Sequence, residues 1–476
     1  MSHPSPDAPP TVASVDADRN WRRFVLFRVL FNARFYYPVL AILFLDLGLS
    51  AAQYTMLNFA WALAIVFTDV PAGVLADRIG RRPLVIAAGV CMVIEMALLI
   101  LAPQNGGLIL LLFCLANRIL SGIAEGMASG ADEALVFDSL AERGRSSEWP
   151  HVLDQVMRWQ GVGMIIAMIV GGAVYDPTFL NHLLGAAGFH VHLDKAVTMR
   201  FPIYLNLASA VAALTCALGM REPVTRTRHA APVNGGEGEQ GGSNIAGAAT
   251  VGVERTAWQI ASNAARWIWQ TPAALFVITA AVLIDCVTRL FLTFSSSYFR
   301  LIHLPEALFG FIGALMGGLG LLVSPIARRM VTRNTMLRNY LLLGAVVLAG
   351  LAGVACRWTY WGVLFLLPLG GAMTALGYVV SYYLNALADS GHRATVLSFK
   401  GVAINLGYGF ISLLFALVLR TAHPADGSAP NPDAAFAQGL TVLPLWLIFS
   451  AILCTVAFAK YRGLLSIIPK AEENPG

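Results

Sequence analysis

The chain has 476 residues, of which 57% are hydrophobic and only 12% are charged, and its mean hydropathy is +0.67. A water-soluble protein of this length cannot bury so much apolar surface, so the composition argues against a soluble enzyme or binding domain and predicts a membrane protein. The formal net charge of +5 is small and is expected to reflect membrane orientation, so it gives no indication of nucleic-acid binding.

Residues 1–20 are polar and rich in proline, and they lack the apolar stretch of a cleaved signal peptide, so we expect a disordered cytoplasmic tail. From Phe24 onward, apolar stretches of about 20 residues recur, the length that a helix needs to cross a hydrocarbon core of roughly 30 Å. We expect twelve membrane-spanning helices, over residues 24–47, 52–76, 83–102, 108–130, 154–175, 199–219, 272–296, 306–327, 336–356, 361–384, 395–419 and 439–459. The predicted fold class is therefore an all-α integral membrane protein.

A segment of different composition divides these helices into six and six. Residues 230–252 are rich in Gly, Ala and Asn, which is typical of a flexible linker. Residues 253–270 have apolar and polar side chains at helical spacing, which fits either a short helix on the cytoplasmic membrane surface or an amphipathic start to the seventh helix. The expected organisation is a first bundle over 21–220, a cytoplasmic linker over 221–271, a second bundle over 272–462 and a cytoplasmic tail over 463–476.

The basic residues are distributed unevenly between the two sides of the membrane. If both termini are cytoplasmic, 22 of the 32 Lys and Arg residues fall in or beside cytoplasmic segments, 5 fall on the outer side and 5 lie within helices. Such an excess marks the cytoplasmic side of a membrane protein. We therefore expect both termini in the cytoplasm, in a multi-pass protein of a bacterial inner (cytoplasmic) membrane.

The most specific motif lies between the second and third expected helices and reads Gly73-Val-Leu-Ala-Asp77-Arg78-Ile-Gly80-Arg81-Arg82-Pro83. Glycines allow a tight turn and a close approach of helices, a carboxylate can lie at the positive N-terminus of a neighbouring helix, and arginines can bind carboxylates or lipid phosphates. Anchoring on the cytoplasmic side would explain the arginines, but neither the aspartate nor the two glycines.

This motif resembles the cytoplasmic loop signature of the major facilitator superfamily, G-x-x-x-D-R-x-G-R-R, at every defining position. Arg118-x-x-x-Gly122 in the fourth helix resembles a second motif of that family. The resemblance implies the family's fold, with two pseudo-symmetric bundles of six helices. It also implies alternating access, in which the two bundles rock about a central site. We expect the protein to be a monomer.

The resemblance also implies a latch between the two bundles. Asp77 is expected to cap the start of the eleventh helix, near Arg393, when the transporter faces outward. An arginine of the loop is then expected to pair with an acid at the inner end of the fourth helix. The residues assigned to this latch are Gly73, Asp77, Arg78, Gly80, Arg81, Arg82, Asp132 and Glu133, with Asp138 as a further available acid.

Charged side chains within the expected helices are candidates for binding substrate or protons, because a charge in hydrocarbon is costly. They are Arg34, Glu95, Arg118, Glu125, Asp285 and Arg289. Each also has a structural alternative, an ion pair between or within helices, and Asp285 and Arg289 at i, i+4 can neutralise each other. Glu95, apparently a lone carboxyl, fits either a proton carrier or a neutral group bonded to a neighbouring backbone.

The expected function is secondary active transport of a small organic solute by alternating access. Proton-coupled export is the first expectation, because the loop motif is intact. The fifth helix reads Gly163-x-x-x-Ala167-Met168-x-x-Gly171-Gly172, which resembles the family's antiporter motif with Ala-Met in place of Gly-Pro. That departure favours the alternative, an uptake symporter or uniporter.

A non-transporting receptor or a polytopic lipid-modifying enzyme is a further alternative, but it would need a sensing or catalytic feature that the sequence does not reveal. No phosphate-binding loop, nucleophile elbow or paired Cys and His spacing is present, so we expect no enzymatic activity, no cofactor and no metal site. The expected partners are protons, membrane lipid and a small-molecule substrate. Arg34 and Arg118 favour an anionic or zwitterionic substrate, because a guanidinium binds carboxylates and phosphates. The alternative is that they pair with Glu95, Glu125 or Asp285.

Overall fold

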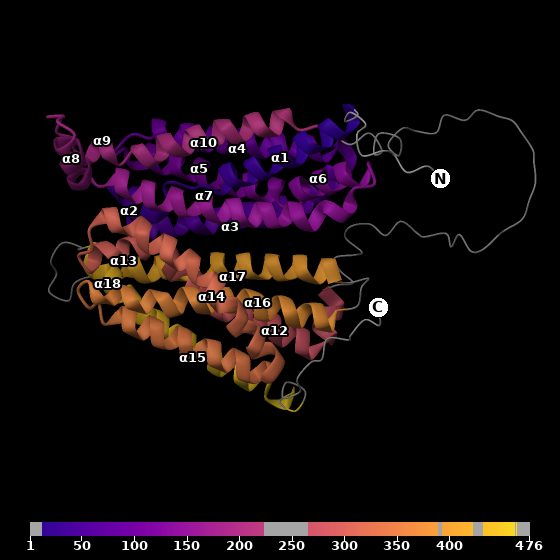
Figure 1. Ribbon diagram of the computed structural model, residues 1–476. Coiled ribbons are helices and arrows are strands. Elements are labelled where there is room, and N and C mark those ends of the chain that lie inside the picture. The colour runs from indigo at the N-terminus through magenta and orange to yellow at the C-terminus, as the bar shows by residue number, and fades with distance from the viewer. Residues whose placement is uncertain (1–11, 223–264, 389–392, 422–431, 462, 464–476) are drawn as a thin grey trace, which may run out of the picture.

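The computed structural model describes residues 12–222, 265–388, 393–421, 432–461 and 463, and the regular elements in these ranges are all helices (Figure 1). Twelve of the helical segments are long and apolar enough to span a membrane. This confirms the expected all-α membrane fold and the number of spanning helices.

The helices form two groups that lie side by side (Figure 1). The first half contains α1 (Val12–Asn32), η1 (Tyr37–Val39), α2 (Leu40–Asp46), α3 (Ala51–Ile79), α4 (Arg81–Leu101), α5 (Gly107–Ala128), α6 (Ala131–Ala141), η2 (Ser146–Glu148), α7 (Trp149–Tyr175), α8 (Pro177–Ala186), α9 (Lys195–Thr198) and α10 (Phe201–Gly219). The second half contains α12 (Pro272–Thr293), α13 (Ser295–Leu301), η4 (Glu306–Leu308), α14 (Phe309–Arg333), α15 (Met336–Ala355), η5 (Trp361–Phe365), α16 (Leu366–Leu387), α17 (Arg393–Thr421), α18 (Pro432–Ala457) and η6 (Ala459–Tyr461).

The two ends of the bundle differ. The short helices α2, α8, α9 and α13 gather at one end, which we call the loop-helix end (Figure 1). The helix α1 begins and α18 ends at the opposite end, which we call the terminal end. The assignment of the terminal end to the cytoplasm remains a prediction from the basic residues.

Several expected helices have different boundaries in the structure. The first expected helix is interrupted after Asn32, where Pro38 in η1 lacks the N–H that a continuous helix needs and disfavours helical geometry at the residue before it. The fourth turns at Gly130, with φ of 73°, and continues as α6 to Ala141. The helix α8 was not expected; its N-cap Asp176 accepts hydrogen bonds from the backbone N–H groups of Thr178 and Phe179.

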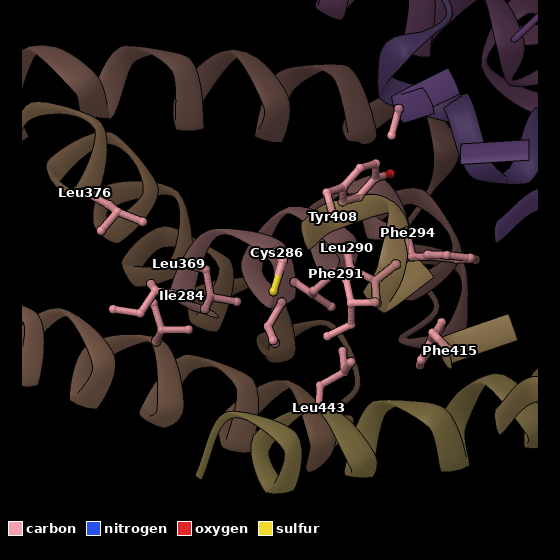
Figure 2. Close-up of a cluster of buried hydrophobic side chains, with 14 of the residues drawn as sticks. Ile284, Cys286, Leu290, Phe291, Phe294, Leu369, Leu376, Tyr408, Phe415 and Leu443 are labelled. Atoms are coloured by element: carbon pink, nitrogen blue, oxygen red, sulfur yellow. The ribbon is translucent and has the colours of Figure 1, made fainter. Parts of the chain in front are cut away.

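A buried apolar cluster surrounds α12 in the second half and also extends into the first half. This helix packs against α15, α16, α17 and α18. The side chains labelled in the close-up of this cluster are Ile284, Cys286, Leu290 and Phe291 of α12, Phe294 just after it, Leu369 and Leu376 of α16, Tyr408 and Phe415 of α17, and Leu443 of α18 (Figure 2). Dense packing of this kind resists local deformation, so we expect the second half to move as a unit.

The halves contact each other mainly through two helix pairs, α3 with α17 and α7 with α14. Glycines permit the second contact: a Cβ built on Gly172 would lie 2.7 Å from the backbone nitrogen of Gly310. A larger side chain there would push the two backbones apart.

Most of the expected linker lies outside the described residues, as do residues 1–11 and 464–476 of the two expected tails. Of the expected surface helix, residues 265–270 are described and helical, and they are followed by a break at Thr271 before α12 begins.

Candidate functional site

A cavity of about 340 Å³ lies between the two halves. The lining residues come from both, namely Tyr37, Pro38, Leu40, Trp61, Arg118 and Met168 from the first half and Arg289, Leu292, Thr293, Ser295, Phe299, Phe309, Gly313, Met316, Met373 and Tyr408 from the second. We call this the central cavity. A second cavity of about 300 Å³ shares Trp61 and Arg289 with it and continues along α3 toward the terminal end, past Asp69 and Glu125.

Arg118 on α5 is the most isolated charge of the central cavity. Its side chain is buried, with the residue only 5% exposed, and one Nη donates a hydrogen bond to Oδ1 of Asn58 at 3.0 Å. The guanidinium carbon lies 5.2 Å from the ring centroid of Trp61, which allows a cation–π contact. Among the described residues, Nε has no hydrogen-bond partner and no carboxylate lies within ion-pair distance. Arg118 is therefore a buried cation whose direct contacts among the described residues are with neutral groups, Asn58 and Trp61.

Arg289 on α12, by contrast, has a carboxylate partner. Its Nε lies 2.9 Å from Oδ2 of Asp285, one turn earlier on the same helix. It also donates a hydrogen bond of 3.3 Å to Asn405 and lies 5.7 Å from the ring centroid of Tyr408. The i, i+4 pair anticipated from the spacing is present, and it neutralises the second guanidinium of the cavity.

Arg34 and Glu95 form a buried ion pair within the first half. Arg34 lies in the interruption after α1 and donates to Oε1 of Glu95 on α4 at 2.5 Å. Neither side chain is appreciably exposed. Glu95 is thus not the isolated carboxyl that the sequence suggested, because its partner comes from a helix break that the hydropathy pattern does not reveal. Neither residue lines the central cavity or the second one.

Glu125 lies on α5, two turns beyond Arg118, and lines the second cavity. Among the described residues, no Lys, Arg or His nitrogen lies within ion-pair distance of its carboxylate. It interacts at longer range with Arg34, Arg118, Arg289 and Glu95. Glu125 is therefore an acid beside the cavity whose charge is not fixed by a direct partner.

The loop motif connects α3 and α4 through Gly80, whose φ of 98° favours glycine. The backbone N–H groups of Arg81 and Arg82 donate to the carboxylate of Glu222 at 2.9 and 2.7 Å, so this acid caps the start of α4. Glu222 was not expected in this role, because it lies in the segment interpreted as linker. Gly73 has open space beside it, so close helix packing does not require a glycine there.

One arginine of the loop motif pairs with the fourth helix as expected. Arg81 lies 2.5 Å from the carboxylate of Asp138 on α6. The acids assigned to the latch pair elsewhere, because Arg28 of α1 lies 3.2 Å from Asp132 and 2.5 Å from Glu133. That part of the assignment is therefore corrected.

The contact expected for Asp77 at the start of the eleventh helix involves side chains outside the described part of the chain. The side chains of Asp77, Arg78 and Arg393 lie outside the described part of the chain.

The halves are joined at the loop-helix end by five polar side chains, which we call the ion cluster. Arg300 donates to both carboxylate oxygens of Asp46 at 2.7 and 2.8 Å and to Glu306 at 2.6 Å. Tyr175 donates to Asp46 at 2.6 Å, and Lys195 pairs with Glu306. Burial alone would lower the pKa of Arg300, but the hydrogen bonds to Asp46 and the two nearby carboxylates hold it well above its usual value.

Hydrogen bonds to backbone N–H groups also join the two halves at the loop-helix end. The hydroxyl oxygen of Ser296, on α13, accepts hydrogen bonds from the backbone N–H groups of Ala41 and Ile42 at 3.1 and 3.3 Å, which are in the first turn of α2. The carboxylate of Asp176 in the first half accepts from the backbone N–H of Ala307 in the second. These contacts join residues that are far apart in the chain and follow no local pattern, so the sequence does not predict them.

Comparisons with known proteins agree with this architecture. A family model described as Major Facilitator Superfamily matches residues 24–412. A solved nucleoside transporter, NupG, is 13% identical with a TM-score of 0.65, and the match covers 94% of this chain and 99% of that one. A bacterial homologue of the human lysosomal transporter Spinster, solved in an inward-facing conformation, is 15% identical with a TM-score of 0.64 and coverage of 96% and 99%.

A third structure, tetrameric PepTSo2, is 13% identical with a TM-score of 0.58, covering 94% of this chain and 99% of that one. No curated protein sequence matches the chain. At these identities the solved structures show a common fold, and the family model covers most of the chain. The chain therefore belongs to the Major Facilitator Superfamily, and it is a transporter and not an enzyme.

Proposed function

We propose that the protein exports a small organic solute by alternating access, driven by protons. The observation that carries this proposal is the central cavity, which both halves line, together with the ion cluster that joins the two halves at the loop-helix end. A site at the interface of two rocking halves is the arrangement by which secondary transporters expose one substrate to two sides in turn.

Glu125 is the proposed proton site. It lines the second cavity and has no direct ion-pair partner among the described residues, and it lies in the field of the cations Arg34, Arg118 and Arg289 and of the anion Glu95. A proton on Glu125 would strengthen the net positive field at Arg118, whereas its loss would weaken it. Such a change couples protonation to the binding of an anionic substrate.

Uptake by a symporter or uniporter is the second candidate. The helix α7 runs without interruption through Ala167 and Met168, where the antiporter motif of the family has Gly-Pro. Met168 lines the central cavity. A missing proline removes the usual cause of a kink at this position, and this departure favours a mechanism other than antiport.

The direction of transport is tested in vesicles of both orientations. A growth screen of a deletion strain against many compounds supplies the substrates, and their accumulation is then measured in inside-out and right-side-out vesicles under an imposed pH gradient. Accumulation in inside-out vesicles that are acidic inside supports export. Accumulation in right-side-out vesicles supports uptake instead, and a chemically altered product would contradict transport as the primary activity.

The proposed orientation has its own test. We expect both termini and the 221–271 segment to face the cytoplasm, as the distribution of basic residues indicates. In intact spheroplasts, an impermeant thiol reagent should label a single cysteine introduced as Ala187→Cys but not one introduced as Ser243→Cys. The reverse pattern would overturn the topology.

A further inference from the structure

We infer that the central cavity binds an aromatic monocarboxylate, with the carboxylate on Arg118 and the ring between side chains of the two halves. The inference deepens the proposed function, because it rests on this cavity being the transport site. It does not depend on the direction of transport or on proton coupling.

The charge of the cavity points to one negative charge on the substrate. Its lining contains two guanidinium groups, Arg118 and Arg289, and no carboxylate. Arg289 pairs with Asp285 at 2.9 Å, whereas Arg118 has no paired carboxylate among the described residues, and Glu125 acts on it only at longer range from the second cavity. A monoanion would balance Arg118, whereas a dianion would bring an unpaired charge into a buried site at a large cost.

The hydrogen-bonding groups of Arg118 point to a carboxylate. One Nη is engaged with the amide oxygen of Asn58, and the buried Nε has no partner among the described residues. A buried donor without a partner is costly, and a bound acceptor would remove that cost. Carboxylates match the planar arrangement of guanidinium donors and form short, charge-assisted hydrogen bonds with it.

The walls of the cavity point to an aromatic ring. Five aromatic side chains line it, namely Tyr37, Trp61, Phe299, Phe309 and Tyr408, together with three methionines. Aromatic rings favour edge-to-face and offset contacts with one another, and methionine sulfur packs well against ring edges. The volume of about 340 Å³ lies at the lower end of the range for small-molecule sites, which fits a ring with a short acidic substituent.

The ring and the charge lie within reach of one small molecule. The guanidinium of Arg118 is 5.2 Å from the centroid of Trp61, and Trp61 meets Tyr408 of the other half edge to face, with centroids 6.2 Å apart. A carboxylate on Arg118 therefore places the rest of the molecule where the halves meet. Such a ligand interacts differently with the closed and open arrangements of the halves, which a transported substrate must do.

The test measures binding to the purified full-length protein by isothermal titration calorimetry with four probes: benzoate, cyclohexanecarboxylate, benzamide and phthalate. Benzoate should bind at least tenfold more tightly than the other three. Cyclohexanecarboxylate lacks the aromatic ring, benzamide lacks the negative charge, and phthalate carries two negative charges. Equal affinity for benzoate and benzamide would overturn the carboxylate assignment, and equal affinity for benzoate and cyclohexanecarboxylate would overturn the aromatic one.

Variants locate the site. Arg118→Gln should lower benzoate affinity at least tenfold, and Trp61→Leu should lower it severalfold. The matched controls are Arg338→Gln on α15 and Phe410→Leu on α17, both at exposed side chains, and they should bind like the wild type. If Arg118→Gln does not fold, Arg118→Lys tests the same point, since it keeps the charge but loses the paired donors and should also weaken binding. Unchanged affinity in a folded variant of Arg118 would overturn the proposal.

Failure of this inference can be told apart from failure of the proposed function. If none of the four probes binds while another solute is transported in vesicles, the aromatic carboxylate is wrong and the transport function stands. If benzoate binds through Arg118 as described but no solute, benzoate included, accumulates in vesicles of either orientation, the inferred site stands and the transport proposal fails.

Discussion

The two ends of the molecule use their ion pairs differently. At the loop-helix end, Arg300 and Glu306 of the second half bind Asp46 and Lys195 of the first, so the charges join the halves. Toward the terminal end, the described pairs Arg28–Asp132 and Arg81–Asp138 lie within the first half. Polar contacts thus join the two halves at the loop-helix end, whereas toward the terminal end they stabilise the first half alone. A pair across the halves should control conformation, and a pair within a half should control folding.

The largest effect is expected from breaking a pair within a half. Arg34→Ala leaves Glu95 buried without its partner, which should cost about 3 to 5 kcal/mol of stability. The melting temperature of the detergent-purified variant measures this loss. The double variant Arg34→Met with Glu95→Gln removes both charges and should recover most of it. A melting temperature of Arg34→Ala equal to that of the wild type would refute the structural role of this pair.

A smaller loss of stability, and a larger change of conformation, is expected from breaking the ion cluster. Arg300 is partly exposed, so Arg300→Ala should lower the free energy of unfolding by only about 1 to 3 kcal/mol. The main effect of this substitution should be that the two halves separate at the loop-helix end. A cysteine introduced as Ser295→Cys, which lines the central cavity, should then react faster with a reagent applied from that side. Arg420→Ala, at an exposed arginine of the same end, is the control and should leave the labelling rate unchanged.

At the terminal end, Asp77→Asn tests the proposed latch. A carboxylate at a helix N-terminus contributes in only one of the two conformations, so its loss should shift their balance by about 1 to 3 kcal/mol and leave the fold intact. We expect transport to be abolished in a protein that expresses and melts normally. Wild-type turnover would refute the latch assignment.

The smallest effect on stability is expected at Glu125. Since no direct ion pair is broken, Glu125→Gln should change stability by less than about 1 kcal/mol. Substrate binding should remain measurable but lose its pH dependence, whereas Arg118→Ala should weaken binding itself. Binding measured at two pH values, beside melting curves, checks both. A large shared fall in melting temperature would instead show that the two residues are structural.

The sequence was sufficient for features that depend on local pattern. Apolar length predicted twelve helices, and the loop motif predicted a contact between one of its arginines and the fourth helix, which Arg81 makes. The spacing of Asp285 and Arg289 offered their pair as one of two alternatives, and the structure contains it. These features depend on residues that are close in the chain or belong to a known motif. The division of the chain into two halves also follows from the composition of the intervening segment.

Contacts between distant residues were missed. Asp46 and Arg300 are 254 positions apart, and no periodicity relates them. The pair of Arg34 with Glu95 was one of several open alternatives, and spacing alone could not select it; in the structure Pro38 interrupts the first expected helix, and Arg34 lies beside Glu95. The cap of α4 by Glu222 likewise depends on how α10 ends beside the loop motif. Tertiary packing decides such contacts, so hydropathy and spacing alone cannot supply them.

The hydrogen bonds that the Ser296 hydroxyl accepts make two backbone amides of the first half sensitive to the separation of the halves. The backbone N–H groups of Ala41 and Ile42 depend on this side chain of the opposite half, because the first N–H groups of a helix have no partner within it. When the loop-helix end separates, water must reach both groups. Their amide hydrogens should then exchange with deuterium at a rate that follows the population of the separated state. Deuterium uptake by a peptide spanning residues 40–46 would therefore measure, without an attached probe, how substrate and protons redistribute the two conformations.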